Sequence, residues 1–148
     1  MNNRKLQLKL YGHLYKRVPD LDWEKCVYCD EPMNVYDHCP PITIVENLNV
    51  KEYKKRGNKF RLYPSCSQCN RLLTTFPSTD IYERLDYLIR KYETRLDKIE
   101  VWSKSELEQM GYAMRNHILN NQSSFELLNN KVTALVEHYC SDDYIHLL

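Results

Sequence analysis

Glycine is scarce in this chain, with 3 among 148 residues. The scarcity argues against a glycine-rich phosphate loop, and neither G-x-x-x-x-G-K-[ST] nor G-x-G-x-x-G occurs anywhere in the sequence. Long apolar runs are also missing, because none approaches the length of a membrane span and the first residues lack the apolar core of a signal peptide. From these absences we expect a cytoplasmic protein with no membrane partner and without either of those phosphate-binding loops.

Neither sign of charge dominates the whole chain, but the charges are unevenly distributed. Residues 1–79 contain 13 Lys and Arg against 8 Asp and Glu, whereas residues 80–148 contain 8 against 12, so a balance of +5 and one of −4 give the overall +1. Hydrophobic residues at 43% and charged residues at 28% are typical of a folded domain. A surface that faces a polyanion is therefore expected in the first part of the chain.

Four of the six cysteines form the clearest pattern, Cys26-Val-Tyr-Cys29 followed by Cys66-Ser-Gln-Cys69. A C-x-x-C turn places its two sulfurs on one side, and two such knuckles together give the tetrahedral four-sulfur shell that Zn²⁺ prefers. The alternatives are two redox motifs, which need a βαβ context that is absent here, or a chance pairing. In a cytosolic chain this spacing favours a metal over disulfides, and because all four positions are filled the zinc is expected to be structural.

The sequence pattern divides the chain into three parts. Residues 1–22 contain leucines four apart, as in a helix, and leucines two apart, as in a strand, but the length of the segment favours a helix, which Pro19 would end. Residues 23–79 combine Cys, Pro and Asn with short β-like runs, and they hold too little periodic apolar surface for a core of their own. A metal cross-link is expected to supply the missing stability.

Residues 80–148 are predicted to form three amphipathic helices that pack together as a helical extension. Each predicted helix begins at a capping box, in which an Asp or Ser is followed three residues later by Glu, and continues into an apolar stripe with helical spacing. The stripes are interpreted as core rather than as binding surface. The three boxes are Asp80 with Glu83, Ser103 with Glu106, and Ser123 with Glu126.

Inside the loop that the two knuckles close stands the pair Asp37-His38, at the end of a short β-like run and before two prolines. Adjacent strand residues point to opposite faces, so the pair suits two tasks, a carboxylate that binds a hard cation and an imidazole that activates water. Phosphodiester hydrolysis needs both, although such a pair alone is also typical of a capping or core role. Asn70, directly after Cys69, favours the catalytic interpretation, because its amide oxygen in the first turn of a helix could join Asp37 as a second ligand of one cation.

The order C-x-x-C, Asp-His-x-Pro-Pro and C-x-x-C-Asn resembles the zinc-containing HNH endonucleases, the ββα-metal family, particularly those of bacteriophages. The resemblance covers about residues 23–76. It implies an α+β fold in which two paired strands, one near Tyr36 and one near Leu62, pack on a helix that begins near Asn70. The helices of residues 80–148 would follow this core as a C-terminal extension.

The resemblance also implies roles for individual residues. His38 would be the general base, Asp37 and Asn70 would bind the catalytic Mg²⁺ or Mn²⁺, and the four cysteines would hold the structural zinc. One position departs from the family, because Arg61 stands where a central Asn usually helps to hold the base. Arg61 is expected either to contact the scissile phosphate or to be a solvated strand residue.

A basic run of six residues within 11 positions lies between the Asp-His pair and the second knuckle, with Tyr53 and Phe60 interleaved. Clusters of Lys and Arg bind phosphates and release counterions, so affinity should fall steeply with salt. A solvated loop is the simpler interpretation of a basic run, but the place of this one beside the predicted cleft favours contact with DNA. Its members are Lys51, Lys54, Lys55, Arg56, Lys59 and Arg61.

These patterns predict a metal-dependent HNH endonuclease that hydrolyses DNA, in the cytoplasm of a host cell if a bacteriophage encodes it. A single-metal site cuts one strand at a time, so double-strand cleavage would need a homodimer or two visits. One rival is a zinc-stabilised DNA-binding module without catalysis, in which Asp37 and His38 are structural. The other is a protein-binding adaptor or inhibitor that uses the acidic helical part.

Overall fold

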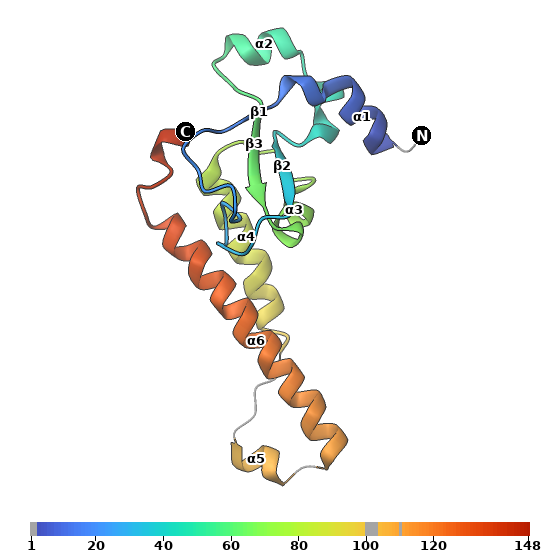
Figure 1. Cartoon of the computed structure of the whole chain (residues 1–148), viewed down its shortest axis with the longest axis vertical. Helices are drawn as coiled ribbons and strands as arrows, with labels where there is room; N and C mark the ends of the chain where they lie inside the picture. The colour runs from blue at the N-terminus through green and yellow to red at the C-terminus, as the bar shows by residue number, and fades with distance from the viewer. Residues whose placement is uncertain (1–2, 100–103, 110) are drawn as a thin grey trace.

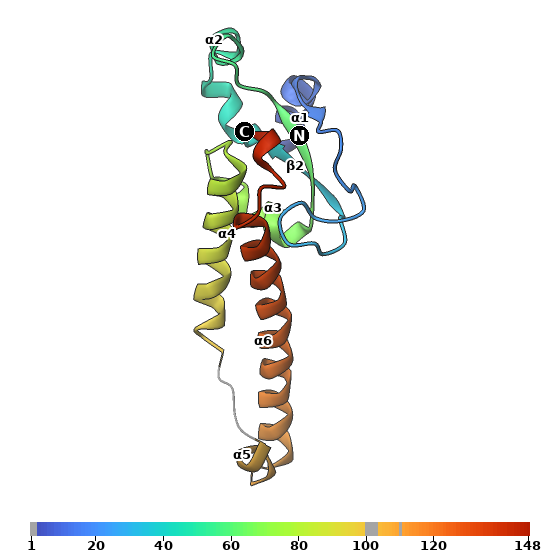
Figure 2. The same cartoon turned by 90° about the vertical axis from the view of Figure 1, so that its left-hand side faces the viewer.

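The computed structural model describes residues 3–99, 104–109 and 111–148 of the chain. It is a mixed α+β protein, as the sequence predicts, with a small sheet at one end of a long pair of helices (Figures 1 and 2). In chain order the elements are α1 (Asn3–Tyr11), η1 (Gly12–Leu14), β1 (Lys16–Arg17), β2 (Val35–Cys39), η2 (Ile42–Asn47), α2 (Val50–Lys55), β3 (Arg61–Ser65), α3 (Ser67–Leu73), α4 (Ile81–Leu96), α5 (Lys104–Glu108), α6 (Tyr112–Tyr139) and η3 (Ile145–Leu147).

The sheet has three strands in the order β1-β3-β2, with β3 in the middle. β2 pairs antiparallel with β3, so that Asp37 lies opposite Tyr63 and His38 lies opposite Leu62. These are the two strands that the sequence predicts to pair, although η2 and α2 lie between them in the chain. Asp37 and His38 thus occupy the third and fourth of the five positions of β2, an edge strand that contacts the helix following β3.

That helix, α3, begins at Ser67 rather than near Asn70. The reason is the cap supplied by Cys66, whose Sγ accepts a hydrogen bond from the Cys69 N–H at 3.4 Å. A side chain that accepts from the third residue of a helix satisfies one of its unpaired N–H groups. The second knuckle is therefore both a pair of sulfur donors and the start of the helix that carries Asn70.

The N-terminal segment is only in part the helix expected from the sequence. α1 ends at Tyr11, and Lys16–Arg17 form a strand parallel to β3, so the expectation of a helix up to Pro19 is wrong for these residues. The N–H groups on either side of Arg17 donate to carbonyls of the β3 segment at 3.1 and 3.2 Å. This pairing with an otherwise open strand edge outweighs a weak local preference for helix.

Most of the described residues between 80 and 148 lie in helices, and α4 begins where the sequence predicts. Asp80 Oδ1 accepts hydrogen bonds from the N–H groups of Tyr82 at 2.8 Å and Glu83 at 3.3 Å. The Glu83 carboxylate accepts from the Ser78 hydroxyl, and Ser78 Oγ in turn accepts from the Asp80 N–H at 3.2 Å. Asp80 thus caps the helix as predicted. The Glu83 carboxylate is connected to the Asp80 N–H through the Ser78 hydroxyl.

The other two predicted helix starts have different outcomes. The one at Ser123 with Glu126 is wrong, because α6 runs through both residues without a break. Inside α6 the neighbouring Ser124 hydroxyl donates to the Asn120 carbonyl at 3.1 Å, which is how a helix accommodates a serine in its interior. The start at Ser103 lies outside the described residues.

One buried core joins the two knuckles to α3, α4 and the C-terminal half of α6. α4 and α6 run antiparallel side by side, as both views show (Figures 1 and 2), and Leu85, Leu88, Tyr92 and Leu135 on their facing sides are fully buried. A smaller core lies between η1, η2 and the start of β3. The helical part is therefore packed directly onto the cysteine knuckles.

No helix in the described ranges has both the length and the apolar character needed to cross a membrane.

Candidate metal centre and active site

The four predicted zinc ligands come together in the fold. Cys26 and Cys29 lie on the turn that precedes β2, Cys66 caps α3 and Cys69 lies in its first turn. All four are buried, and their Sγ atoms lie within 4.8 Å of one another, with those of Cys29 and Cys66 3.7 Å apart. A tetrahedral zinc ion with Zn–S bonds of about 2.3 Å holds its sulfurs about 3.8 Å apart, so this cluster could hold a structural zinc.

The chemistry of the donor set also fits a cation. Hydrogen bonds with the other three thiols of the cluster, that of Cys26 foremost, lower the pKa of the Cys66 thiol and raise the pKa of the Cys69 thiol. Four thiols this close cannot all lose their protons unless a cation lies among them. With Zn²⁺ held by four thiolates, the centre carries a net charge of −2 and leaves no position for a substrate water.

Two side chains of the helical part contact this cluster, and the sequence pattern did not predict either contact. The Tyr92 hydroxyl of α4 lies 3.1 Å from Cys69 Sγ. Lys131 Nζ of α6 lies 3.6 Å from Cys66 Sγ and donates to Gln68 Oε1 at 2.8 Å. Burial alone would lower the pKa of Lys131, but the cysteine cluster outweighs burial and raises it, so Lys131 is charged at neutral pH.

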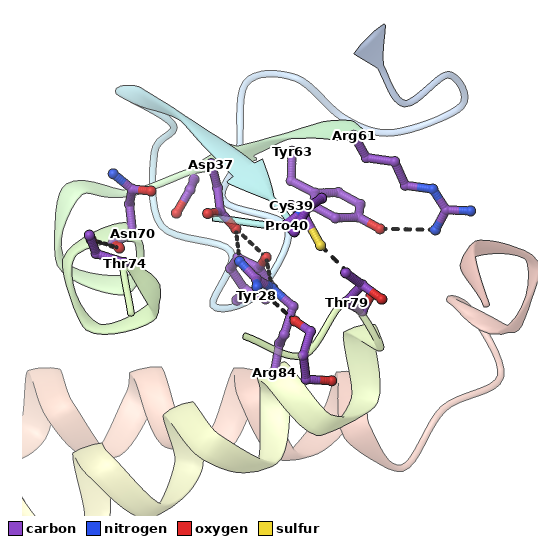
Figure 3. Close-up of polar contacts among 12 residues, drawn as sticks. Tyr28, Asp37, Cys39, Pro40, Arg61, Tyr63, Asn70, Thr74, Thr79 and Arg84 are labelled. Carbon is purple, nitrogen blue, oxygen red and sulfur yellow. Dashed lines mark hydrogen bonds and ion pairs between the residues drawn. The ribbon is translucent and has the colours of Figure 1, made fainter. Parts of the chain in front are cut away.

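The three predicted catalytic residues line one small cleft. Asp37 and His38 come from β2, Asn70 comes from α3, and Arg4 of α1 and Thr74 are among the other residues of the wall. The cleft has a volume of about 20 Å³, which accommodates one water-sized group. Asp37 and Asn70, both labelled in Figure 3, line this cleft from β2 and from α3. The fold thus brings together residues that are far apart in the sequence.

A buried cation that the sequence pattern did not predict holds Asp37. Arg84 Nη2 of α4 donates to Asp37 Oδ2 at 2.7 Å, and the Tyr28 hydroxyl donates to the same oxygen (Figure 3). Arg84 Nε also donates to the Tyr28 hydroxyl at 3.0 Å, and Arg84 is fully buried. Both contacts to the carboxylate use Oδ2, so Oδ1 has no hydrogen bond among the described residues. Oδ1 is the atom that a cation in the cleft would contact.

The signal that could have found Arg84 and Lys131 is a charge inside an apolar stripe. Each stands three residues after one member of its stripe and four residues before another, which places it on the buried face of the helix. A buried charge needs an opposite charge or several hydrogen bonds. The sequence alone does not identify the partner, because it lies on another element. The flanking stripe members are Ile81 and Leu88 for Arg84, and Leu128 and Leu135 for Lys131.

His38 leaves β2 on the face opposite to Asp37, as strand alternation predicts. Its ring packs edge-on against Tyr15 with the centroids 4.7 Å apart, and the Tyr15 hydroxyl is fixed by donating to the Pro40 carbonyl at 2.5 Å. Burial lowers the pKa of His38 below its usual value, and the positive charge of Arg4 lowers it further, against the opposing effect of Asp37. The imidazole is therefore neutral at pH 7, which is the form that can accept a proton from water.

Arg61, which stands where the sequence resemblance would place an Asn, does not face the cleft. Its guanidinium donates to the Tyr63 hydroxyl at 3.3 Å and to the Leu147 carbonyl, and Figure 3 shows it beyond Tyr63, far from Asn70. In this orientation Arg61 fixes the C-terminal segment to β3. The residue that packs against His38 is Tyr15, which lies just before β1.

The other basic residues of the run fall into two groups. Lys54 and Lys59, together with Arg61, line a pocket of about 560 Å³ whose wall also contains Lys16 and Arg17. The two residues of β1 were not among the predicted DNA-binding residues. The remaining three, Lys51, Lys55 and Arg56, are exposed on or just after α2.

The cleft offers a neutral imidazole, a carboxylate oxygen and an amide oxygen around a space for one small group. Proteins bind Mg²⁺ through one or two such oxygens together with phosphate oxygens of a substrate. Because Arg84 balances the charge of Asp37, a divalent cation here would depend on a bound phosphate for much of its stabilisation, and the residues fit Mg²⁺ or Mn²⁺ on that condition.

Comparison with family models, with curated proteins and with solved structures gives no match to this chain. Its function is therefore inferred from the cleft and the cysteine cluster.

Proposed function

We propose that this chain is a metal-dependent DNA endonuclease of the HNH, or ββα-metal, type. The observation that supports the proposal is the convergence of Asp37, His38 and Asn70 on one small cleft. Support also comes from the order of elements, two antiparallel strands followed by a helix, beside a four-cysteine cluster that could hold zinc. This is the arrangement that the sequence resemblance implies.

His38 is the general base in this proposal. Its neutral imidazole accepts a proton from a water molecule, the water oxygen forms a bond to phosphorus, and the bond between phosphorus and the leaving sugar oxygen breaks. The leaving oxygen takes up a proton from solvent. Asp37 Oδ1 and Asn70 Oδ1 would hold Mg²⁺ or Mn²⁺, which when bound would offset the negative charge that gathers on the phosphate and the leaving oxygen.

DNA would lie across the basic first part of the chain. Lys16, Arg17, Lys54 and Lys59 line one pocket, and Arg4 stands at the cleft itself. These side chains would contact phosphates and position the duplex, and they carry no base specificity of their own. Binding is therefore expected to weaken steeply as salt concentration rises.

Cleavage of supercoiled plasmid with added Mg²⁺ or Mn²⁺ tests the proposal. His38→Ala is compared with wild type and with His13→Ala, which removes an exposed histidine from η1. We expect wild type and His13→Ala to give nicked product before linear product, and His38→Ala to cut at least about 100-fold more slowly, the usual size of a general-base effect. The proposal fails if folded, zinc-loaded wild type cuts none of the DNA tested with either ion.

One observation favours a second candidate function, a zinc-stabilised DNA-binding module without catalysis. Arg84 neutralises Asp37 inside a buried network, which also suits a carboxylate with a purely structural task. Such a module would bind DNA with the same salt dependence and would cut it with neither ion. An adaptor or inhibitor that uses the acidic helices would instead show no salt-dependent DNA binding.

A further inference from the structure

Lys131 is a buried cation without an acidic partner. It is 7% exposed, and no carboxylate of the described residues forms an ion pair with it. Its Nζ contacts Cys66 Sγ, Gln68 Oε1 and, 5.2 Å from the ring centroid, Tyr92. Burying an ammonium group without an opposite charge is strongly unfavourable. Within the described part of the chain, the negative charge that Lys131 contacts is that of the cysteine cluster.

The second helix of the pair contacts the same knuckle. Tyr92 of α4 is fully buried, and its hydroxyl lies 3.1 Å from Cys69 Sγ. Toward a thiolate the hydroxyl is the donor, because a thiolate has no proton to give. Each cysteine of the second knuckle therefore has its own donor from the helical pair, Lys131 for Cys66 and Tyr92 for Cys69.

These two donors bear directly on how well the cluster would keep a metal ion. A centre of net charge −2 in a buried position is stabilised by a cation beside it and by hydrogen bonds to its sulfurs. A donor also draws charge away from a thiolate, which makes the sulfur a poorer target for protons and oxidants. Partners outside the ligand shell are known to influence metal affinity strongly.

We propose that the α4–α6 pair is the charge-balancing cap of the zinc centre, with Lys131 as its central residue. The cap strengthens retention of zinc, and the loaded thiolates in turn hold α6 on the core, because coupling between two such events is reciprocal. Without Lys131 the centre keeps its four ligands but loses the cation that offsets its charge. The inference concerns the metal centre and does not depend on the proposed endonuclease activity.

The zinc affinity of variants, measured by competition with a chromophoric zinc chelator, tests the cap. Lys131→Met removes the charge and keeps most of the volume, Lys131→Arg keeps the charge, and Lys91→Met removes an exposed lysine from α4 as the matched control. We expect Lys131→Met to bind zinc about 10- to 100-fold more weakly, the range typical for loss of such a partner. Lys131→Arg should lose much less, and Lys91→Met should match wild type. Tyr92→Phe should show a smaller loss than Lys131→Met.

Hydrogen exchange of the same zinc-loaded proteins tests whether the loaded cluster holds α6 on the core through Lys131. Lys131→Met should exchange faster than wild type in the C-terminal half of α6, and Lys131→Arg should not. Equal zinc affinity of wild type and Lys131→Met would overturn the proposal, and equal losses in the Met and Arg variants would do the same, because packing rather than charge would then be the cause. If Lys131→Met does not fold, Lys131→Gln takes its place beside Lys131→Arg under the same criteria.

Discussion

The two main parts of the chain, residues 23–79 and 80–148, differ in how their important residues are recognised. In the first part these residues are chemically distinctive and stand at fixed spacings, as the two C-x-x-C knuckles and the Asp-His pair do. In the second part they are ordinary helix residues, yet each completes a polar centre of the first part. Arg84 binds the carboxylate of Asp37, and Tyr92 and Lys131 contact the cysteine cluster. Motif residues thus set where chemistry can occur, and helix residues set the charge balance there.

Loss of metal binding at the cysteine cluster should have the largest effect, because a zinc ion there is expected to hold residues 23–79 together. Cys69→Ser is expected to abolish stable zinc binding and unfold residues 23–79, since the apparent metal-binding free energy of small zinc-stabilised domains is about 10–16 kcal/mol. Circular dichroism during thermal unfolding measures the loss. Cys140→Ser changes an exposed cysteine outside the cluster and should leave zinc content and Tm unchanged. A Cys69→Ser protein that melts like wild type would show that the cluster does not hold this part together.

Breaking the link between the two parts at Arg84 should have the next largest effect. Arg84→Met leaves Asp37 as an uncompensated buried charge, for which the expected loss is about 3–5 kcal/mol in the free energy of unfolding. Arg90→Met on the same helix is the matched control, because it removes only a surface ion pair of 3.0 Å with Asp86 and should cost under about 1 kcal/mol. Urea denaturation of the zinc-loaded proteins measures both. Similar losses in the two variants would contradict the special role given to Arg84.

Substitutions at the observed helix start, Asp80, and at the wrongly predicted one, Ser123, should have smaller effects on the free energy of unfolding, and these effects should differ. Asp80→Ala removes the cap of α4 and should lower the free energy of unfolding by about 1 kcal/mol. Ser123→Ala should change it by less than about 0.5 kcal/mol, because α6 passes through this exposed position without a break. Urea denaturation again gives both values. A loss at Ser123 as large as that at Asp80 would indicate that a helix begins at Ser123 in solution.

Sequence was most informative where covalent spacing determines geometry. Two residues between cysteines fix a knuckle, so the four-sulfur cluster could be predicted. The helix of Asn70 begins at the second knuckle, and the strand of Asp37 lies in the loop between the two knuckles, so the motif order brings both close to the cluster. The mixed α+β character and the start of α4 at Asp80 were likewise local properties and are confirmed.

The features that sequence did not reveal depend on contacts between distant elements. Lys16–Arg17 become a strand only because β3 offers them an edge. Ser123 lies inside α6, a 28-residue helix whose C-terminal half packs on α4, so the local capping signal at Ser123 does not start a helix. The positions of Arg84 and Lys131 in apolar stripes indicate that each charge is buried. Their partners could not be identified from the sequence, because they lie on other elements, β2 for Arg84 and the start of α3 for Lys131. Tyr15 beside His38 belongs to the same class, since it reaches the imidazole through the pairing of β1 with β3.

The nicking rate of Asn70→Ala tests the endonuclease proposal most directly. The Asn70 side chain makes no hydrogen bond among the described residues, while its backbone carbonyl accepts from Thr74 whatever the side chain is. The substitution should therefore leave folding, zinc content and DNA binding unchanged while removing one of the two proposed cation ligands. On supercoiled plasmid at fixed Mg²⁺ concentration we predict nicking at least about 100-fold slower than wild type, the scale of losing one group that stabilises transition-state charge. Nicking at the wild-type rate would contradict the account, because the reaction could then not take place at this cleft.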